Sequence, residues 1–251
     1  MPIEVEIEIR ECTTLDELAA CVQLQRDVFA LPDIEISPVR HLVVTKSAGG
    51  FVLGAFSAKV LVGFVLSVPA FLRGQKAFYS HMTAVRADYQ GSGVGAKLKW
   101  AQRERSISEG VRLIKWTFEP VKARNAFFNL EKLGATVREY KENFYGVDYI
   151  SAPQETEKVG LATDRLFAEW ELESPKVNTL SAGDGFIETR RVAREVTVPA
   201  DWYQLVSRNA KAARREQLRI RSEFESALTD GFICRGFRRD DRSPAYLFFE
   251  D

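Results

Sequence analysis

Three glycines lie close together in the sequence "VRADYQGSGVGAKLKW", which begins at Val85: Gly91, Gly93 and Gly95. The residues before them predict the end of a β-strand, and those after them predict a helix. A glycine-rich turn at the start of a helix leaves several main-chain N–H groups without a partner inside the helix, and glycine lets a ligand approach the backbone closely. The helix dipole adds partial positive charge there, so the turn predicts a site for phosphate or pyrophosphate.

The turn matches neither of the two common nucleotide-binding motifs. "QGSGVGAKL" lacks the GK[ST] ending of a nucleoside triphosphate loop. It also follows a fourth predicted strand, whereas a dinucleotide-binding motif opens its βαβ unit. A loop that only reverses the chain is the alternative interpretation, so the glycines alone do not identify a ligand.

Hydrophobic patterns over residues 3–146 predict a mixed sheet with helices on its faces. Apolar residues alternate with polar ones from Ile3 to Ile9, as in a strand. Thr14 and Glu17 have the spacing of a capping box, which predicts the start of a helix of about four turns. The expected order is β-α-β-β-β-α-β-α-β, which is typical of the α/β (α+β) class. Further strands are expected within residues 51–71, 77–85, 111–118 and 136–146, and further helices from the glycine turn to residue 110 and over residues 121–134.

Residues 51–71 are apolar enough to raise the question of a membrane helix. The stretch carries a single charge, Lys59, and is long enough to span a bilayer. However, it is rich in Val and Phe, contains Gly54, Gly63 and Pro69, and has its charge near the middle. Two buried strands joined by a tight turn explain all of these features. We therefore expect a hairpin here and no membrane partner.

The sequence changes character after residue 150. Residues 151–180 are richer in Ser, Pro, Thr and Glu, which predicts a boundary between a first domain, 1–150, and a smaller C-terminal α/β region, 151–251. "VRADY" at 85–89 and "VPADW" at 198–202 both precede a helix, a glycine and a strand. Coincidence and a degenerate half-repeat both explain this echo. Further strands are expected within residues 164–172, 189–198, 232–239 and 245–249, and a long helix over residues 202–229.

Composition excludes several classes of protein. The 251 residues include 35 basic and 35 acidic ones, so no global field draws the chain to nucleic acid or to an anionic membrane. Cys12, Cys21 and Cys234 are odd in number and without CxxC spacing, which argues against a disulfide framework and against a zinc site. The N-terminus lacks the pattern of a signal peptide. We expect a protein of the reducing cytoplasm that holds no metal.

The glycine turn resembles the acetyl-CoA loop of the GNAT N-acetyltransferase superfamily. The pattern in that family is Gln or Arg, two residues, Gly, one residue, then Gly or Ala, and Gln90, Gly93 and Gly95 fill these positions. "ARNAFFNLEKLGA" is similar to the last helix of the family, and the order of elements also matches. The resemblance covers about residues 3–146. It implies a GNAT-like acetyl-CoA-binding domain and an N-acetyltransferase that acts on a primary amine of a small molecule or a peptide.

The resemblance also implies which residues bind acetyl-CoA. The pyrophosphate would lie on main-chain amides of the glycine turn, and the pantetheine arm would enter between two splayed strands and bind amides of the first of them. Asn125 matches an asparagine that contacts the thiol end of the cofactor, although its place near a helix start also suits a capping residue. The implied cofactor-binding residues are Ala84, Val85, Gln90, Gly91, Ser92, Gly93, Val94, Gly95 and Asn125.

The catalytic residues are less clear from the sequence. Acetyl transfer needs a base for the amine and gains from an acid for the leaving thiolate. Members of the family commonly supply the acid as a tyrosine, but Leu130 stands at that position, so Tyr145 is our substitute. Glu119 and His81 are the candidate bases because both lie on strands expected to flank the thioester. A structural aromatic at Tyr145 and a structural histidine at His81 are the alternatives.

Other functions stay open in the sequence. Because Leu130 stands where the family commonly has a tyrosine acid, the protein could also be a catalytically silent CoA-binding sensor or scaffold. Residues 207–226 hold several arginines, but interleaved glutamates favour a solvated helix face over a nucleic-acid surface, so no nucleic-acid partner is expected. A third possibility is that this region covers the acceptor site or forms a homodimer interface. The basic residues are Arg208, Lys211, Arg214, Arg215, Arg219 and Arg221.

Overall fold

The computed structural model describes residues 6–29, 31–146 and 161–251. Contacts divide the chain into two compact units, Met1–Lys115 and Trp116–Asp251, and the boundary falls within strand β5, Leu113–Phe118. Both units combine helices with strands, which confirms the predicted fold class. The domain boundary predicted after residue 150 falls among residues outside the described ranges, as do Ile3 and Val5, and that boundary stays a prediction.

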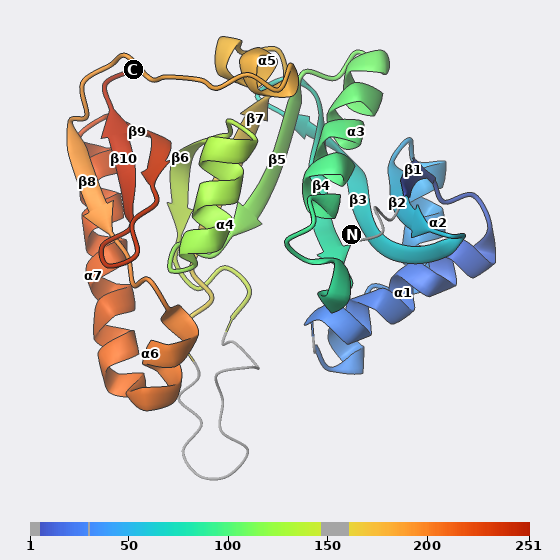
Figure 1. Cartoon of the computed structure of the whole chain (residues 1–251), viewed down its shortest axis with the longest axis horizontal. Coiled ribbons are helices and arrows are strands. Elements are labelled where there is room, and N and C mark those ends of the chain that lie inside the picture. Colours follow the sequence, from blue (N-terminus) through green and yellow to red (C-terminus); the bar gives the residue numbers. More distant parts are fainter. Residues whose placement is uncertain (1–5, 30, 147–160) are drawn as a thin grey trace, which may run out of the picture. The chain divides into compact units, whose positions relative to one another are not determined.

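The first unit is a sheet with helices on both faces (Figure 1). Strands β1 to β4 pair antiparallel in sequence order, and β5 begins parallel to β4, with Phe78 opposite Ile114. The predicted strands and helices are present. The elements are β1 Ile7–Glu11, α1 Leu15–Phe29, the 3₁₀ turn Asp33–Glu35, α2 Val39–Ser47, β2 Phe51–Ser57, β3 Val60–Leu72, β4 Gln75–Val85, the 3₁₀ turn Ala87–Tyr89 and α3 Val94–Ser108.

Alternation along β3 separates two layers of this unit. Phe64 and Leu66 are fully buried in a core that α1 and α2 supply from one face of the sheet. Gly63 points to the other face, where a Cβ atom would lie 3.1 Å from the Leu98 side chain of α3. Because successive side chains of a strand point to opposite faces, a single strand supports both layers.

A buried polar cluster fixes α3 on the sheet. Gln102 donates to Ser67 Oγ of β3 at 2.7 Å, and Lys99 donates to Gln102 Oε1 at 2.6 Å and to Ser80 Oγ of β4 at 3.2 Å. Burial lowers the pKa of Lys99 well below its ordinary value. Since buried polar groups are costly without partners, this cluster favours one seating of α3 and thus one position of the turn before it.

The hairpin predicted over residues 51–71 is confirmed. β2 and β3 pair antiparallel around Ala58 and Lys59, which both have positive φ angles of 46° and 72°. Two central residues with positive φ are the signature of a tight hairpin turn that suits the twist of the strands. Among the described residues, no helix is both long and apolar enough to cross a membrane.

The start of α1 is confirmed in detail, whereas α2 was not expected. Thr14 Oγ1 accepts from the Glu17 main-chain N–H at 3.2 Å, and Glu17 Oε2 accepts from the Thr14 N–H at 3.1 Å, which is a complete capping box. The amphipathic pattern of α2 is weak because Leu42 is buried while Val44 is 64% exposed.

The second unit is a sheet of strand order β5-β7-β6-β9-β10-β8. Helix α7 packs on β6 and β8, and α4 with the π-helical segment after it packs on β9. The predicted strands of the C-terminal region are present. The remaining elements are α4 Ala123–Phe127, the π-helical segment Phe128–Lys132, β6 Thr136–Lys141, β7 Arg165–Glu171, α5 Pro175–Ser181, β8 Arg194–Thr197, α6 Trp202–Arg208, α7 Ala210–Thr229, β9 Ile233–Arg238 and β10 Ala245–Phe249.

Two features of the second unit differ from the expectation. The single long helix over residues 202–229 is wrong, because Asn209 leaves the helical region at φ −157° and caps α7 by accepting from the Ala212 N–H at 2.9 Å. Asparagine is among the best N-cap residues, so it starts a new helix rather than continuing the old one. Helix α5, with Pro175 in its first turn, was not expected.

A buried carboxylate joins the end of β6 to the middle of α7 in this unit. The Asp164 side chain is 0% exposed, and Arg221 of α7 donates to both of its oxygens at 2.9 and 3.0 Å. Tyr140 Oη donates to Asp164 at 2.6 Å, and the Asn143 N–H donates at 3.0 Å. A buried charge with this many donors is well compensated, so each partner depends on the others.

We expect Asp164→Asn to lower the free energy of unfolding by about 3 kcal/mol, because it leaves the Arg221 guanidinium short of its buried counter-charge. Urea unfolding followed by circular dichroism measures the change. Asp184→Asn is the matched control, since Asp184 is exposed and should change the stability by less than about 0.5 kcal/mol. Equal effects of the two substitutions would contradict the role of Asp164.

Candidate functional site

The glycine turn lies between β4 and α3, as the sequence predicts. Gly91 and Gly93 have φ angles of 82° and 90°, and Gly93 stands directly before the helix, at its N-cap. A Cβ atom on either glycine would meet no atom within 4 Å. The glycines therefore serve the backbone conformation and leave the space outside the turn open, which is what a close-approaching ligand needs.

The main-chain donors of this turn are available. Within the described chain, the N–H groups of residues 91–96 donate no hydrogen bond, and the first amide of α3 with an acceptor is Lys97, which donates to Gly93 at 3.0 Å. Gln90 differs from its neighbours because its N–H donates to the Ala87 carbonyl at 3.2 Å. Unpaired amides at the positive end of a helix form an anion site.

Side chains of the turn brace it from within. Gln90 Nε2 donates to the Val85 carbonyl at 2.9 Å, and Ser92 Oγ donates to the Tyr89 carbonyl at 2.5 Å. These bonds satisfy carbonyl groups of the turn and leave its amides free. In the structure, Gln90 and Ser92 thus shape the site through their side chains, a role that the glycine pattern alone does not reveal.

The end of β4 carries two further residues that the sequence singled out. Ala84 is fully buried and lies opposite Phe64 of β3, and Val85 is half-buried opposite Gly63. The next residue, Arg86, donates its N–H to the Val62 carbonyl at 2.8 Å. β4 is therefore held by β3 up to the point where the turn begins.

His81 of β4 lies in a small polar group of the first unit. Its Nε2 is 3.4 Å from Ser37 Oγ, and its ring meets His41 edge-on with the centroids 5.7 Å apart. Part of its surface is exposed. Desolvation by its neighbours, and then the charge that His41 can carry, lower the pKa of His81, so the ring is neutral at pH 7.

The second unit brings Glu119 and Tyr145 to the same arginine. Arg165 lies 3.6 Å from Glu119 Oε1, and its guanidinium stands 5.2 Å from the centre of the Tyr145 ring. Lys122 forms a second ion pair with Glu119. Tyr145 is 54% exposed, and its hydroxyl lies 3.1 Å from Thr117 Oγ1. The sequence pattern did not point to Arg165, Lys122 or Thr117, because their relation to Glu119 and Tyr145 is tertiary.

Asn125 and Leu130 lie in the segment that resembles the last helix of the GNAT family, and their surroundings differ from each other. Asn125 is exposed on α4 and does not cap it, since the N-cap is Lys122, whose side chain makes no capping bond. The side chain of Asn125 forms no hydrogen bond among the described residues. Leu130 is fully buried in the π-helical segment. Its position therefore holds a core side chain and no proton donor.

Comparison with known proteins agrees with the turn and the element order. Residues 16–135 match the sequence model of a family described as the acetyltransferase (GNAT) family. Over these residues the chain is similar to the acetyltransferase domain of that family. The resemblance predicted over residues 3–146 is thereby confirmed for residues 16–135. The comparison with curated proteins found no match.

Solved structures of GNAT proteins share the fold. An N-acetyltransferase from Staphylococcus aureus is 14% identical with a TM-score of 0.54, covering 67% of this chain and 99% of its own. A ribosomal-protein-alanine N-acetyltransferase from Escherichia coli is 15% identical with a TM-score of 0.51, covering 67% and 96%. At these identities the likeness extends to the fold alone.

The echo of the turn at residues 198–202 forms no second anion site. Asp201 caps α6 with its own side chain, which accepts from the Gln204 N–H at 2.9 Å. A carboxylate at that place both uses a free amide and repels anions. In α7, Arg219 pairs with Glu216 and Glu223, in keeping with the solvated helix face. Within the described ranges, no group of three or more His, Cys, Asp or Glu side chains could hold a metal.

We expect Gly93→Ala to lower the free energy of unfolding by about 1–2 kcal/mol, because a Cβ atom strains the backbone at φ 90° even in open space. Gly95→Ala is the matched control. Gly95 lies within α3, and its added Cβ would only touch Val85 at 3.8 Å, so helix propensity should leave the stability unchanged or raise it. Thermal unfolding of both variants checks this, and the reverse order would contradict the geometry of the turn.

Proposed function

We propose that this protein transfers an acetyl group from acetyl-CoA to a primary amine of a small molecule or a peptide. The observation that carries the proposal is the row of main-chain N–H groups of residues 91–96, which have no acceptor within the described chain and stand at the N-terminus of α3. A diphosphate offers several oxygen acceptors to such a row. The match of residues 16–135 to the GNAT family supports acyl transfer as the type of reaction.

The turn would bind the donor by its main chain. The amides of Gly91, Ser92, Gly93, Val94 and Gly95 would hold the pyrophosphate, and Gln90 would brace the turn with its side chain. In this assignment the amides of Ala84 and Val85 bind the pantetheine arm, and Asn125 is the residue that the family resemblance assigns to its thiol end. When bound, acetyl-CoA supplies a thioester carbonyl that is open to attack by a neutral amine.

Side chains would act as the base for the attacking amine and as the acid for the leaving thiolate. An ammonium group must lose its proton before attack, and we assign Glu119 as the base, with His81 as the second candidate. Two cations, Lys122 and Arg165, hold the Glu119 carboxylate in place. His81 is neutral at pH 7 and can accept a proton. The exposed Tyr145 hydroxyl would donate a proton to the leaving thiolate.

A sensor or scaffold that binds CoA without turnover is the second candidate. It is favoured by Leu130, which is buried where members of the family commonly hold the tyrosine acid. The two ion pairs of Glu119 also suit a structural carboxylate. This candidate shares the anion site with the first and differs only in catalysis, so binding and turnover must be measured separately.

Isothermal titration tests the binding half of the proposal. We expect the protein to bind acetyl-CoA at about 50 µM or below, within the usual range for enzyme substrates, and Gly93→Asp to weaken binding at least about tenfold because it adds a negative charge to the anion site. Gly183→Asp is the matched control, since Gly183 has a φ of 86° and open space around it. No heat from the unmodified protein would rule out both candidate functions.

Turnover separates the enzyme from the sensor. We expect acetylation within a panel of primary amines and amino-terminal peptides, and a loss of about 10²-fold in kcat/KM for Glu119→Gln with acetyl-CoA binding unchanged. Glu225→Gln, on the exposed side of α7, is the control. If His81→Asn causes the loss instead, His81 is the base. Binding without acetylation of any amine in the panel would favour the sensor.

A further inference from the structure

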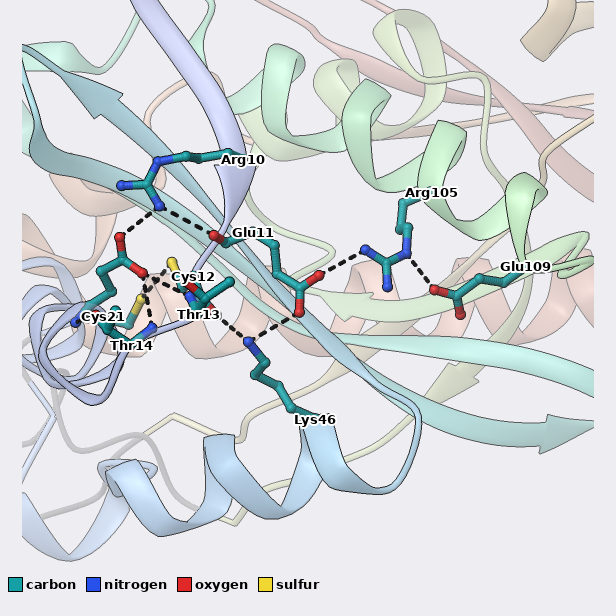
Figure 2. Close-up of polar contacts among 10 residues, drawn as sticks. Arg10, Glu11, Cys12, Thr13, Thr14, Cys21, Lys46, Arg105 and Glu109 are labelled. Atoms are coloured by element: carbon teal, nitrogen blue, oxygen red, sulfur yellow. Dashed lines mark hydrogen bonds and ion pairs between the residues drawn. The ribbon is translucent and has the colours of Figure 1, made fainter.

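Two of the three cysteines face each other in the first unit. Cys12 follows β1 directly and Cys21 lies in α1, and their sulfur atoms are 3.9 Å apart with both residues fully buried. Figure 2 shows the two sulfurs side by side. Cys234 belongs to the second unit, is also fully buried, and donates to the Gly236 carbonyl at 3.8 Å. The pair was invisible in the sequence because strand and helix geometry bring it together.

The surroundings shift the pKa values of the two thiols in opposite directions. A hydrogen bond from Cys21 lowers the pKa of Cys12 against the opposing effects of burial and of the Glu17 charge, and the nearby charges of Arg10 and Lys46 add to the lowering. The Lys46 ammonium donates to the Cys12 carbonyl and pairs with Glu11 at 3.1 Å (Figure 2). The same bond to Cys12, together with burial, raises the pKa of Cys21. Because the thiolate is the nucleophile, Cys12 is the one poised to react first.

An exposed turn connects the two cysteines along the chain. Residues 13–16 are exposed, and the Glu17 carboxylate closes the turn by accepting from the Thr13 N–H at 2.7 Å and from the Thr14 N–H at 3.1 Å. These bonds lower the pKa of Glu17 to about 2, so the carboxylate is charged at pH 7. The ends of helices open locally at a lower free energy than the core, and the capping box sets how readily this first turn of α1 opens.

We propose that Cys12 and Cys21 are a modification site for small peroxides, where a disulfide forms each time oxidant enters through the opened first turn of α1. The Cys12 thiolate attacks one peroxide oxygen, the O–O bond breaks, and a sulfenic acid and a hydroxide form. The Cys21 sulfur then attacks the Cys12 sulfur, the S–O bond breaks, and the S–S bond forms. The two sulfurs lose two electrons to the peroxide, and the two thiol protons leave in two molecules of water.

Mass spectrometry of the folded, full-length protein tests the disulfide. After hydrogen peroxide treatment, the protein should be lighter by two hydrogen masses than the untreated protein. After denaturation and alkylation, we expect a cross-linked peptide that joins Cys12 to Cys21, and full alkylation of Cys234. In Cys21→Ser, dimedone should trap a sulfenic acid at Cys12, and in Cys12→Ser it should trap none at residue 21. Cys234→Ser is the matched control and should oxidise like the unmodified protein.

Two substitutions in the same turn test the route of entry. Glu17→Gln weakens the capping box and should speed disulfide formation severalfold, while Asp16→Asn removes the same charge from an exposed side chain of that turn and should leave the rate unchanged. Circular dichroism verifies that each variant is folded. The proposal is overturned if all three thiols remain free, or if Cys234 oxidises as fast as the pair. Equal rates for Glu17→Gln and the unmodified protein would overturn the route through the turn.

Discussion

The unpaired main-chain donors at the start of α3 are the constraint on which the interpretation of this protein depends. A helix always begins with N–H groups that lack an intrahelical partner, and most proteins cap them with a side chain. Here the residue before the helix is Gly93, which has no side chain to offer. The described chain leaves the donors of residues 91–96 to something outside itself, and an anion with several oxygens is the partner that such donors favour.

The rest of the first unit keeps that row of donors in place. β4 is bound to β3 as far as the turn, and α3 is fixed on the sheet by the buried cluster of Lys99, Gln102, Ser67 and Ser80. Apolar packing alone would allow α3 to slide, because it is non-directional. Hydrogen bonds between buried groups do not allow this, since each group that loses its partner costs free energy.

Both units use a carboxylate with several donors to hold a helix in place. Glu17 caps the first turn of α1, and Asp164 ties the middle of α7 to the segment after β6. The Glu17 side chain is partly exposed, whereas the Asp164 side chain is fully buried. Hydrogen bonds to a carboxylate therefore hold a helix start that can open locally in the first unit and a contact that stays closed in the second. The difference in burial between the two carboxylates is the reason.

The sequence by itself determined the elements whose signals are local. The glycine turn, the capping box of Thr14 and Glu17, and the hairpin over residues 51–71 all depend on neighbours within a few positions, and each was confirmed. Helix α2 and the break at Asn209 were missed because packing and a single cap outweighed weak patterns. Only tertiary structure decided that Arg165 joins Glu119 to Tyr145 and that two cysteines nine positions apart meet, since strand register and helix packing, which no local pattern encodes, set those distances.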